Sequence, residues 1–273
     1  MKLILNAAVC SDVGRVRQKN EDNFYLMGSV REDVSQPRRK DRCRCEIRES
    51  LFAVADGMGG EANGEAASLM TVQSLRPCQF DAIHKTAAES IRQANRLICQ
   101  EIERNRGRRM GSTLAALYID AGKAVCCNVG DSRGYLLRHG HLRQLTEDHT
   151  RVQQMVRMGM LTPEQAAGHK NRHILSQNIG IFEDEMVIEP AFSEPVALEQ
   201  GDIFLLCSDG LTDMVTDPQI GKALNTGTAA QMVRRLVKLA LEHGGKDNVT
   251  ALVVQVRGPS LPFFCNSGKR STI

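Results

Sequence analysis

The chain contains 273 residues, of which 42% are hydrophobic and 25% are charged, and its formal net charge is +3. This length is enough for one large domain or two small ones. The low net charge argues against a dedicated nucleic-acid-binding protein, because such proteins concentrate basic residues on one face. No run in the sequence approaches the ~20 apolar residues of a membrane-spanning helix. We therefore expect neither nucleic acid nor a membrane as a partner.

The N-terminal residues MKLILNAAVC contain only a short apolar stretch. A secretory signal needs a longer apolar core and a small residue at its cleavage site, so we interpret this stretch as the first strand of the fold. Nine cysteines in a chain without an export signal indicate reduced thiols. These features predict a cytoplasmic protein.

Runs rich in apolar and β-branched residues predict strands, and helical periodicity marks several segments between them. In chain order we expect a strand at 2–9, a strand at 51–55, helices at 64–75 and 81–104, strands at 114–119 and 124–129, helices at 149–158 and 163–167, a strand at 203–207, a helix at 228–243 and a strand at 249–256.

This order lacks the strict strand–helix alternation of a parallel sheet, so it favours an α+β fold with largely antiparallel pairing. Two segments are expected to be loosely structured. Residues 31–50 are rich in Arg, Asp and Glu and poor in apolar side chains. The tail from Gly258 is rich in Pro, Ser and Gly.

The glycine-rich stretch ADGMGGEANGE, residues 55–65, is first considered as a phosphate-binding loop. The spacing of Gly59 and Gly64 fits a P-loop, but Glu65 and Ala66 follow where Lys and Ser or Thr are required. A dinucleotide-binding fingerprint also fails, because its third glycine is missing. Nucleotide binding is therefore not expected here.

Aspartates follow three of the expected buried strands. LFAVAD ends in Asp56, VCCNVGD in Asp131 and IFLLCSD in Asp209. One such aspartate is usually a turn residue, but three at one edge of a sheet would repel one another unless cations neutralise them. Oxygen ligands without clustered His or Cys indicate Mg²⁺ or Mn²⁺ rather than zinc. NED at 20–22 and KDN at 246–248 supply further acids, although capping or turn roles are the simpler interpretation of each.

Seven motifs in order resemble those of the metal-dependent serine/threonine protein phosphatases (the PPM, or type 2C, family) in their compact bacterial form. They are RQKNED (17–22), VADGMGGEANGEAAS (54–68), GSTLAA (111–116), NVGDSRGYLLR (128–138), LTEDHT (145–150), CSDGLTDMV (207–215) and GGKDNVTALVV (244–254). The resemblance spans roughly Ala8 to Val256. It implies a single phosphatase domain over 1–257, with an insertion loop at about 31–50, a flap at about 150–180 and a flexible tail over 258–273.

The resemblance further implies a four-layer α-β-β-α sandwich with two central antiparallel sheets and a metal cluster at one end. Arg17 would bind the substrate phosphate, and Glu21 would support a neighbouring ligand. Two Mn²⁺ or Mg²⁺ ions would be held by Asp22, Asp56, the carbonyl of Gly57, Asp209 and Asp247, while Asp131 would join Asp209 at a third ion.

A water bridging two metal ions would then hydrolyse phosphoserine or phosphothreonine in proteins. The family resemblance implies phosphoprotein substrates, a cognate Ser/Thr kinase that the enzyme opposes, and a monomer. Two alternatives stay open: a catalytically inert PPM-like binding module, and a hydrolase of small phosphate esters. Retention of all four principal aspartates speaks against the inert module.

One position departs from a common family pattern. Many members have histidine after the DG, where it can protonate the leaving oxygen, whereas this chain has Met58. The general acid is therefore unassigned, and a metal-bound water near Asp131 is the hypothesis offered. His149 is expected to start the next helix rather than act in catalysis.

Three other features allow either a simple structural interpretation or a functional one. The basic runs at 38–40 and 104–109 are expected to be solvated loops, although they could attract acidic phosphoproteins. The CRC motif at 43–45 could be a specificity or redox element.

Overall fold

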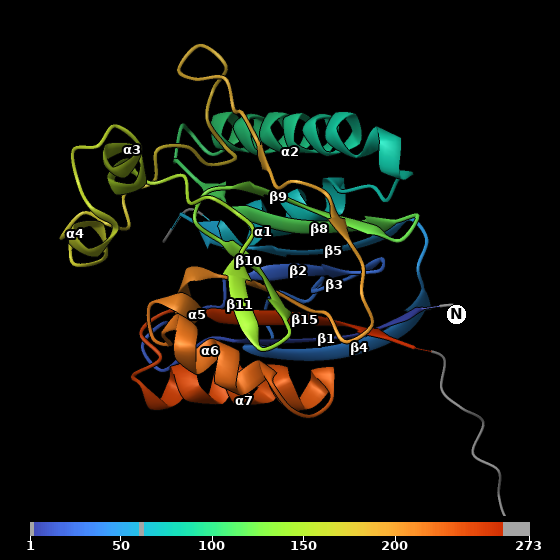
Figure 1. Ribbon diagram of the computed structural model, residues 1–273. Helices are drawn as coiled ribbons and strands as arrows, with labels where there is room; N and C mark the ends of the chain where they lie inside the picture. Colours follow the sequence, from blue (N-terminus) through green and yellow to red (C-terminus); the bar gives the residue numbers. More distant parts are fainter. Residues whose placement is uncertain (1–2, 60–62, 259–273) are drawn as a thin grey trace, which may run out of the picture.

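Two antiparallel β-sheets face each other at the centre of the computed structural model, which describes residues 3–59 and 63–258 (Figure 1). The first sheet has the strand order β11 (His141–Gln144), β10 (Arg133–Arg138), β14 (Ile203–Cys207), β15 (Val249–Arg257), β1 (Ile4–Asp12) and β4 (Arg38–Glu46). The second runs β12 (Ala191–Phe192), β9 (Lys123–Val129), β8 (Leu114–Asp120), β5 (Ser50–Ala55), β2 (Asn23–Leu26) and β3 (Ser29–Val30), with β13 (Val196–Ala197) also paired to β9. A short ribbon joins β6 (Gly57–Met58) to β7 (Gly111–Ser112).

The central strands are buried on both faces, which explains their continuous apolar runs. In β1, Leu5 and Val9 point into the core between the two sheets, whereas Ala8 and Cys10 face the helices on the other side. β1 pairs along its whole length with β15, from Ile4 opposite Arg257 to Asp12 opposite Val249. Strands from the two ends of the described chain therefore lie side by side in the middle of the first sheet.

Helices cover the outer face of each sheet (Figure 1). α5 (Asp209–Thr212), α6 (Asp217–Leu224) and α7 (Ala229–Glu242) pack on the first sheet. α1 (Gly64–Ser74), the 3₁₀ turn η2 (Phe80–Ala82) and α2 (Ile83–Arg104) pack on the second. The expected four-layer α-β-β-α arrangement is confirmed.

Amphipathic spacing and caps explain the two long helices. α2 buries Ile83, Ile91 and Ile98 on one stripe, at the spacing of a helix with one face in a core. α7 begins with a capping box, in which Thr228 and Gln231 satisfy each other's backbone N–H groups.

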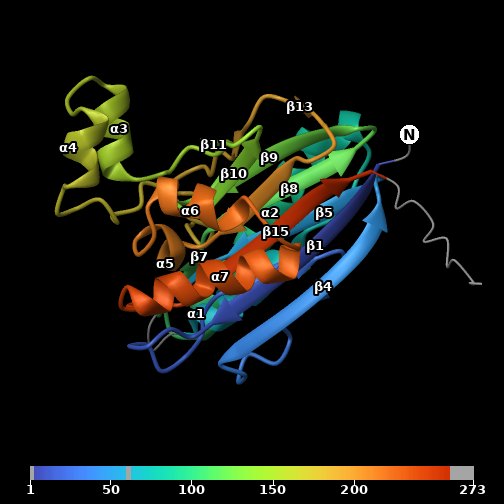
Figure 2. The same cartoon turned by 60° about the horizontal axis from the view of Figure 1, so that its bottom comes forward.

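Two short helices stand away from the sandwich, α3 (Arg151–Arg157) and α4 (Pro163–Ala167), as Figure 2 shows. They lie within residues 150–180, the segment expected to form a flap. Thr150 and Thr162 cap them through their side chains. We call residues 150–180 the flap from here on; its function stays a prediction.

The expectation of a loosely structured segment at 31–50 was wrong. β4 occupies Arg38–Glu46 and pairs with all nine residues of β1. Its residues alternate between exposed and half-buried, with Cys43 and Cys45 packed against the core between the sheets. Five basic residues masked this alternation, because a strand with one solvated face needs few apolar side chains. The basic run at 38–40 therefore lies on a strand and not in a loop.

The other predicted elements are found with shifts of a few residues at their ends, while Lys2 and the tail beyond Gly258 lie outside the described residues. Besides β4, the predictions missed the strands β2, β3, β6, β7, β10, β11, β12 and β13 and the helices α5 and α6. Within residues 3–59 and 63–258, no helix has both the length and the apolar character to cross a membrane.

Candidate metal centre

Five aspartates from separate segments meet at one end of the sandwich. Asp56 follows β5, Asp131 follows β9, Asp209 begins α5 directly after β14, Asp247 precedes β15, and Asp22 precedes β2. All except Asp22 line a cleft of about 450 Å³. Antiparallel strands that end at the same edge bring these residues together although they are 225 positions apart in sequence at the extremes (247 − 22). The structure thus assembles the carboxylate cluster, and its role as a ligand set stays a prediction.

Asp22 lies beneath the cleft and is fully buried. Its Oδ2 accepts hydrogen bonds of 2.7 Å from the hydroxyls of Ser208 and Thr250. Its Oδ1 is buried without a hydrogen-bond partner among the described residues. Burial raises the pKa of Asp22 to about 7, and the two hydroxyls oppose the shift without cancelling it.

The pKa values of the neighbouring carboxylates are also raised. Burial, followed by repulsion from Asp213 and Asp247, raises the pKa of Asp209 to about 6. Burial and the charges of Asp22 and Asp209 raise the pKa of Asp56 well above its ordinary value. The pKa of Asp131 is likewise raised well above its usual range by burial and by Asp209. Without a counter-cation, these groups can be ionised together only at a considerable electrostatic cost.

These donors fit a hard divalent cation. Both Asp22 Oδ1 and Asp209 Oδ1 are buried acceptors that receive no hydrogen bond from the part of the chain described. Unsatisfied buried acceptors are costly, and a bound ion satisfies them. The surrounding donors are carboxylate oxygens, which Mg²⁺ and Mn²⁺ prefer, and thiolates are absent from the described lining of the cleft.

Two glycines allow the chain to approach itself closely at this site. A Cβ on Gly57 would lie 2.1 Å from the carbonyl oxygen of Gly64 and 2.6 Å from that of Glu21. A Cβ on Gly210 would lie 1.9 Å from the carbonyl oxygen of Asn248. Only glycine fits at either position without backbone movement. The glycine after Asp56 and the glycine after Asp209 therefore hold the two aspartate-bearing turns against the segments that carry Glu21 and Asp247.

Arg17 and Glu21 lie at the mouth of the cleft. The exposed guanidinium of Arg17 donates a 2.8 Å hydrogen bond to Asp247 Oδ2. The Glu21 backbone N–H donates to Asn248 Oδ1 at 2.7 Å, and burial together with the charge of Glu65 raises the pKa of the Glu21 carboxyl. The backbone of Glu21 thus ties the Arg17 segment to the Asp247 segment, and the supporting role of its carboxyl stays a prediction.

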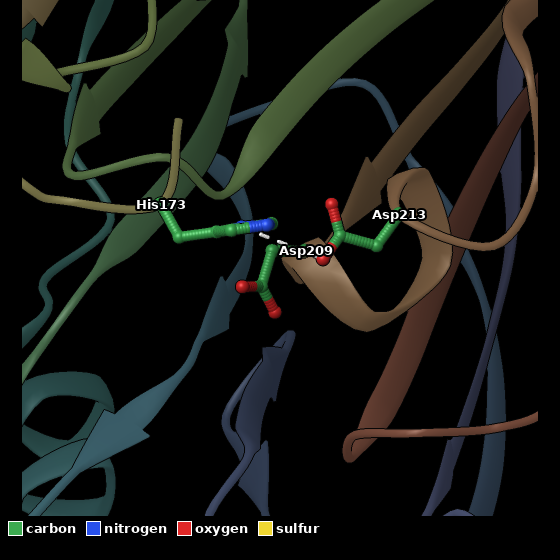
Figure 3. A group of neighbouring side chains, drawn as sticks. All are labelled: His173, Asp209 and Asp213. Atoms are coloured by element: carbon green, nitrogen blue, oxygen red, sulfur yellow. Dashed lines mark ion pairs between the residues drawn. The ribbon is translucent and has the colours of Figure 1, made fainter. Parts of the chain in front are cut away.

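Sequence reasoning missed two residues that the structure adds to this region. His173, on the flap, and Asp213, directly after α5, lie beside Asp209, with ligand-type atoms of all three within 4.8 Å of one another (Figure 3). His173 Nδ1 is 3.5 Å from Asp213 Oδ2, and Arg172 Nη2 is 3.4 Å from Asp213 Oδ1. Asp213 could have been found from its spacing of four from Asp209, one helical turn later. His173 carries no signal of this kind in the sequence.

His149 precedes α3 instead of starting it, and its ring contacts the backbone of a neighbouring turn. Its Nδ1 accepts a hydrogen bond from the backbone N–H of Gly130 at 3.3 Å and is 2.8 Å from Gln177 Nε2. Burial lowers the pKa of His149, which favours the neutral ring that can accept. It thereby fixes the turn that presents Asp131. Met58 lines the cleft and offers no proton donor.

The comparisons with known proteins agree with this geometry. The family model for protein phosphatase 2C matches residues 28–252. The chain is 37% identical over 260 residues to the serine/threonine protein phosphatase PstP of Mycobacterium tuberculosis, covering 93% of this chain and 45% of that protein. It is 34% identical to a serine/threonine phosphatase of Listeria monocytogenes, covering 92% of this chain and 96% of that protein. The chain thus spans about half the length of PstP and nearly all of the Listeria protein.

Solved structures of serine/threonine phosphatases also match the chain. A crystal structure of M. tuberculosis PstP superposes with a TM-score of 0.78 at 35% identity, covering 93% of this chain and 100% of that one. A structure of the PstP catalytic domain in complex with two manganese ions superposes with a TM-score of 0.75, covering 94% and 100%. The fold, the carboxylate cleft and these matches lead to one conclusion: this chain belongs to the protein phosphatase 2C (PPM) family of metal-dependent serine/threonine phosphatases.

Proposed function

We propose that this chain is a Mn²⁺- or Mg²⁺-dependent phosphatase that hydrolyses phosphoserine and phosphothreonine in proteins. The observation that carries the proposal is the convergence of buried carboxylates on one cleft, where two of their oxygens have no hydrogen-bond partner among the described residues. The relatives support it, since they are named serine/threonine phosphatases and the PstP catalytic domain binds two manganese ions.

Asp22, Asp56, the Gly57 carbonyl, Asp209 and Asp247 would hold the two principal ions, and Asp131 with Asp209 a third. Bound there, the ions would supply Lewis acidity for activating water and polarising the phosphoryl group. Ser208 and Thr250 orient Asp22 by donating to one of its oxygens, which leaves the other for a ligand role. Ser208 and Thr250 would thus hold Asp22 in its ligand orientation before an ion binds.

Arg17 is the group that would hold the substrate phosphate. Its guanidinium is exposed at the cleft and bonded only to Asp247 among the described carboxylates. A phosphate offers a bidentate, charge-assisted partner, and the flexible side chain can exchange one anion for the other. Arg17 would thereby fix the phosphorus over the carboxylate cluster.

We also propose that the protein is cytoplasmic, opposes a cognate Ser/Thr kinase and is a monomer. Eight cysteines within the described residues are free thiols, which supports the cytoplasmic location expected from the sequence. A cognate Ser/Thr kinase and a monomeric state are carried over from the family resemblance.

Phosphate release from a phosphothreonine protein tests the proposal, measured with Mn²⁺ and with chelator. We expect turnover only with the metal, and a loss of roughly a hundredfold or more in Asp209→Asn, since several kcal/mol of charge stabilisation depend on the ion. Asp184→Asn, at an exposed aspartate outside the cleft, is the matched control. Turnover that persists in chelator would overturn the metal mechanism. Activity on small esters alone would favour the small-ester hydrolase, and no activity on either would favour the binding module.

A further inference from the structure

A groove runs between β4 and α7 on the outer face of the first sheet. Two adjoining cavities of about 700 and 360 Å³ share Ala8, Arg42 and Ala230, so they form one continuous depression. α7 lies over β15 and β1, and β4 runs beside it without a helix on its outer face (Figure 2). We call this depression the β4–α7 groove.

The two walls of the groove differ in chemistry. Small and apolar side chains, Ala8 of β1 and Ala230 and Val233 of α7, form the floor and one wall. The other wall consists of the outward-facing residues of β4, Lys40, Arg42 and Arg44. Because alternate residues of a strand share a face, these cations repeat at about 6.6–6.8 Å along the groove.

The groove is cationic along its whole length. Arg234 of α7 and Arg257 at the end of β15 add to the basic wall, and both are exposed. Within the described chain, Lys40, Arg42 and Arg234 form no ion pair with a carboxylate, whereas Arg44 already has an interaction partner. The one acidic residue that lines it, Asp41, is engaged elsewhere, with its Oδ2 accepting from Ser29 Oγ at 2.8 Å and lying 3.7 Å from Arg39.

Charged side chains on an edge strand can also serve to prevent sheet-to-sheet aggregation. That role explains cations on β4, but it does not require Arg234 and Arg257 on neighbouring elements, nor the hollow between them. Cations from three elements around a shared apolar floor instead make a binding surface for an anionic chain.

We propose that the β4–α7 groove binds an extended, acidic segment of a partner protein, with carboxylates at alternate positions facing β4. The repeat of an extended peptide matches the spacing of Lys40, Arg42 and Arg44, and its small side chains fit against Ala8 and Ala230. The surface lies outside the metal cleft, so this proposal goes beyond the phosphatase activity and does not depend on it.

Charge also selects between this occupant and the tail of the chain itself. Gly258 lines the groove, and residues 259–273 follow it in sequence. That tail contains Lys269 and Arg270 and no acidic residue, so a cationic groove repels it. A separate acidic segment is the better electrostatic complement.

The test measures binding of a fluorescent ten-residue peptide with alternating Glu and Ser to the 273-residue chain, by anisotropy at low salt. We expect saturable binding that weakens roughly tenfold in Arg42→Glu/Arg234→Glu, because each lost pair is worth a few-fold at an exposed site. The matched control is Arg92→Glu, an exposed arginine on α2 outside the groove, which should leave binding unchanged. The milder Arg42→Gln/Arg234→Gln replaces the double reversal if that variant does not fold, and should weaken binding in the same direction.

Several outcomes would overturn the proposal. These are no binding to the wild type, an equal loss in Arg92→Glu, displacement of the peptide by a synthetic 259–273 segment, or tighter binding to vesicles of phosphatidylserine and phosphatidylcholine than to the peptide. The peptide probe carries no phosphate, so a negative binding result would not affect the interpretation of the phosphatase assay. A negative phosphatase assay would likewise leave the peptide-binding result interpretable.

Discussion

At the scale of single residues, the chemical question raised by the proposed phosphatase reaction is which group would protonate the leaving oxygen. Met58 cannot donate a proton, and His173 is the imidazole that lines the cleft among the described residues. It is carried by the flap beside Asp209 and 3.5 Å from Asp213, a carboxylate that can hold the ring in place (Figure 3). This position offers an alternative to a donor near Asp131.

A comparison of leaving groups separates the two possibilities. An aryl phosphate leaves without protonation, whereas a serine or threonine alkoxide needs a proton. If His173 is the donor, His173→Gln should reduce kcat for a phosphothreonine peptide by about 10²-fold or more while changing aryl-phosphate turnover little. Asp131→Asn should produce that contrast instead if the donor depends on Asp131. Equal effects on both substrates in both variants would exclude each assignment.

At the scale of elements, Asp213 connects the flap to α5. Arg172 and His173 both contact its carboxylate, and all three side chains are partly exposed. Exposed ion pairs contribute little to global stability. They can nevertheless hold a short segment that has few buried contacts of its own, and of α3 and α4 only Val152 is buried.

We therefore expect Asp213→Ala to release the flap locally while the sandwich keeps its stability. Limited proteolysis should cleave within residues 158–174 several-fold faster than in the wild type, with Tm unchanged within about 2 °C. Glu183→Ala, which removes an exposed carboxylate outside the flap, is the control. A large fall in Tm would show that Asp213 supports the whole domain instead.

The strands and helices that could be predicted from the sequence are those with a single clear pattern. Buried strands such as β14 read as continuous apolar runs, and α2 as an amphipathic stripe. β4 was missed because its apolar members are two cysteines between arginines, so composition concealed its alternation. β10, with Arg133 and Gly134 at its start, was hidden for a similar reason: its burial comes from neighbouring strands.

Asp56, Asp131 and Asp209 could be named from their positions after strands, and Asp22 and Asp247 from the family resemblance. The burial and contacts of these aspartates could not be predicted. Burial of Asp22 and its contacts with Ser208 and Thr250 depend on pairings more than 180 positions apart. The contribution of His173 depends on how the flap folds back toward α5, which no local pattern specifies. Long-range packing therefore determines the environment of these residues, which short sequence motifs do not specify.

At the scale of the whole molecule, the carboxylate cluster makes stability depend on pH. The folded-state pKa values of Asp22 and Asp209, about 7 and about 6, lie above the ordinary value of about 3.9. Between about pH 4 and pH 7 the folded chain therefore binds more protons than the unfolded chain. The free energy of unfolding of the metal-free protein should fall as pH rises through this window.

Calorimetry in chelator at pH 5 and pH 8 checks this expectation. The metal-free Tm should be lower at pH 8, and Mn²⁺ should raise Tm more at pH 8 than at pH 5, because cations then replace protons between the carboxylates. Asp22→Asn should flatten the dependence, since an amide does not titrate. A metal-free Tm that increases from pH 5 to pH 8 would contradict the role assigned to this cluster.

The pairing of β1 with β15 also has a consequence for the order in which the protein can be made. β15 leaves the ribosome more than 200 residues after β1, yet the two strands are neighbours over nine residues. Until β15 arrives, β1 and β14 lack the strand that joins them, and the Asp247 segment that closes the cleft is missing. Contacts at such long sequence separation slow folding and leave apolar strand faces exposed in the meantime. The first sheet and the carboxylate cleft are therefore completed together, once β15 has been made, and a nascent chain that stops before β15 lacks the complete sheet.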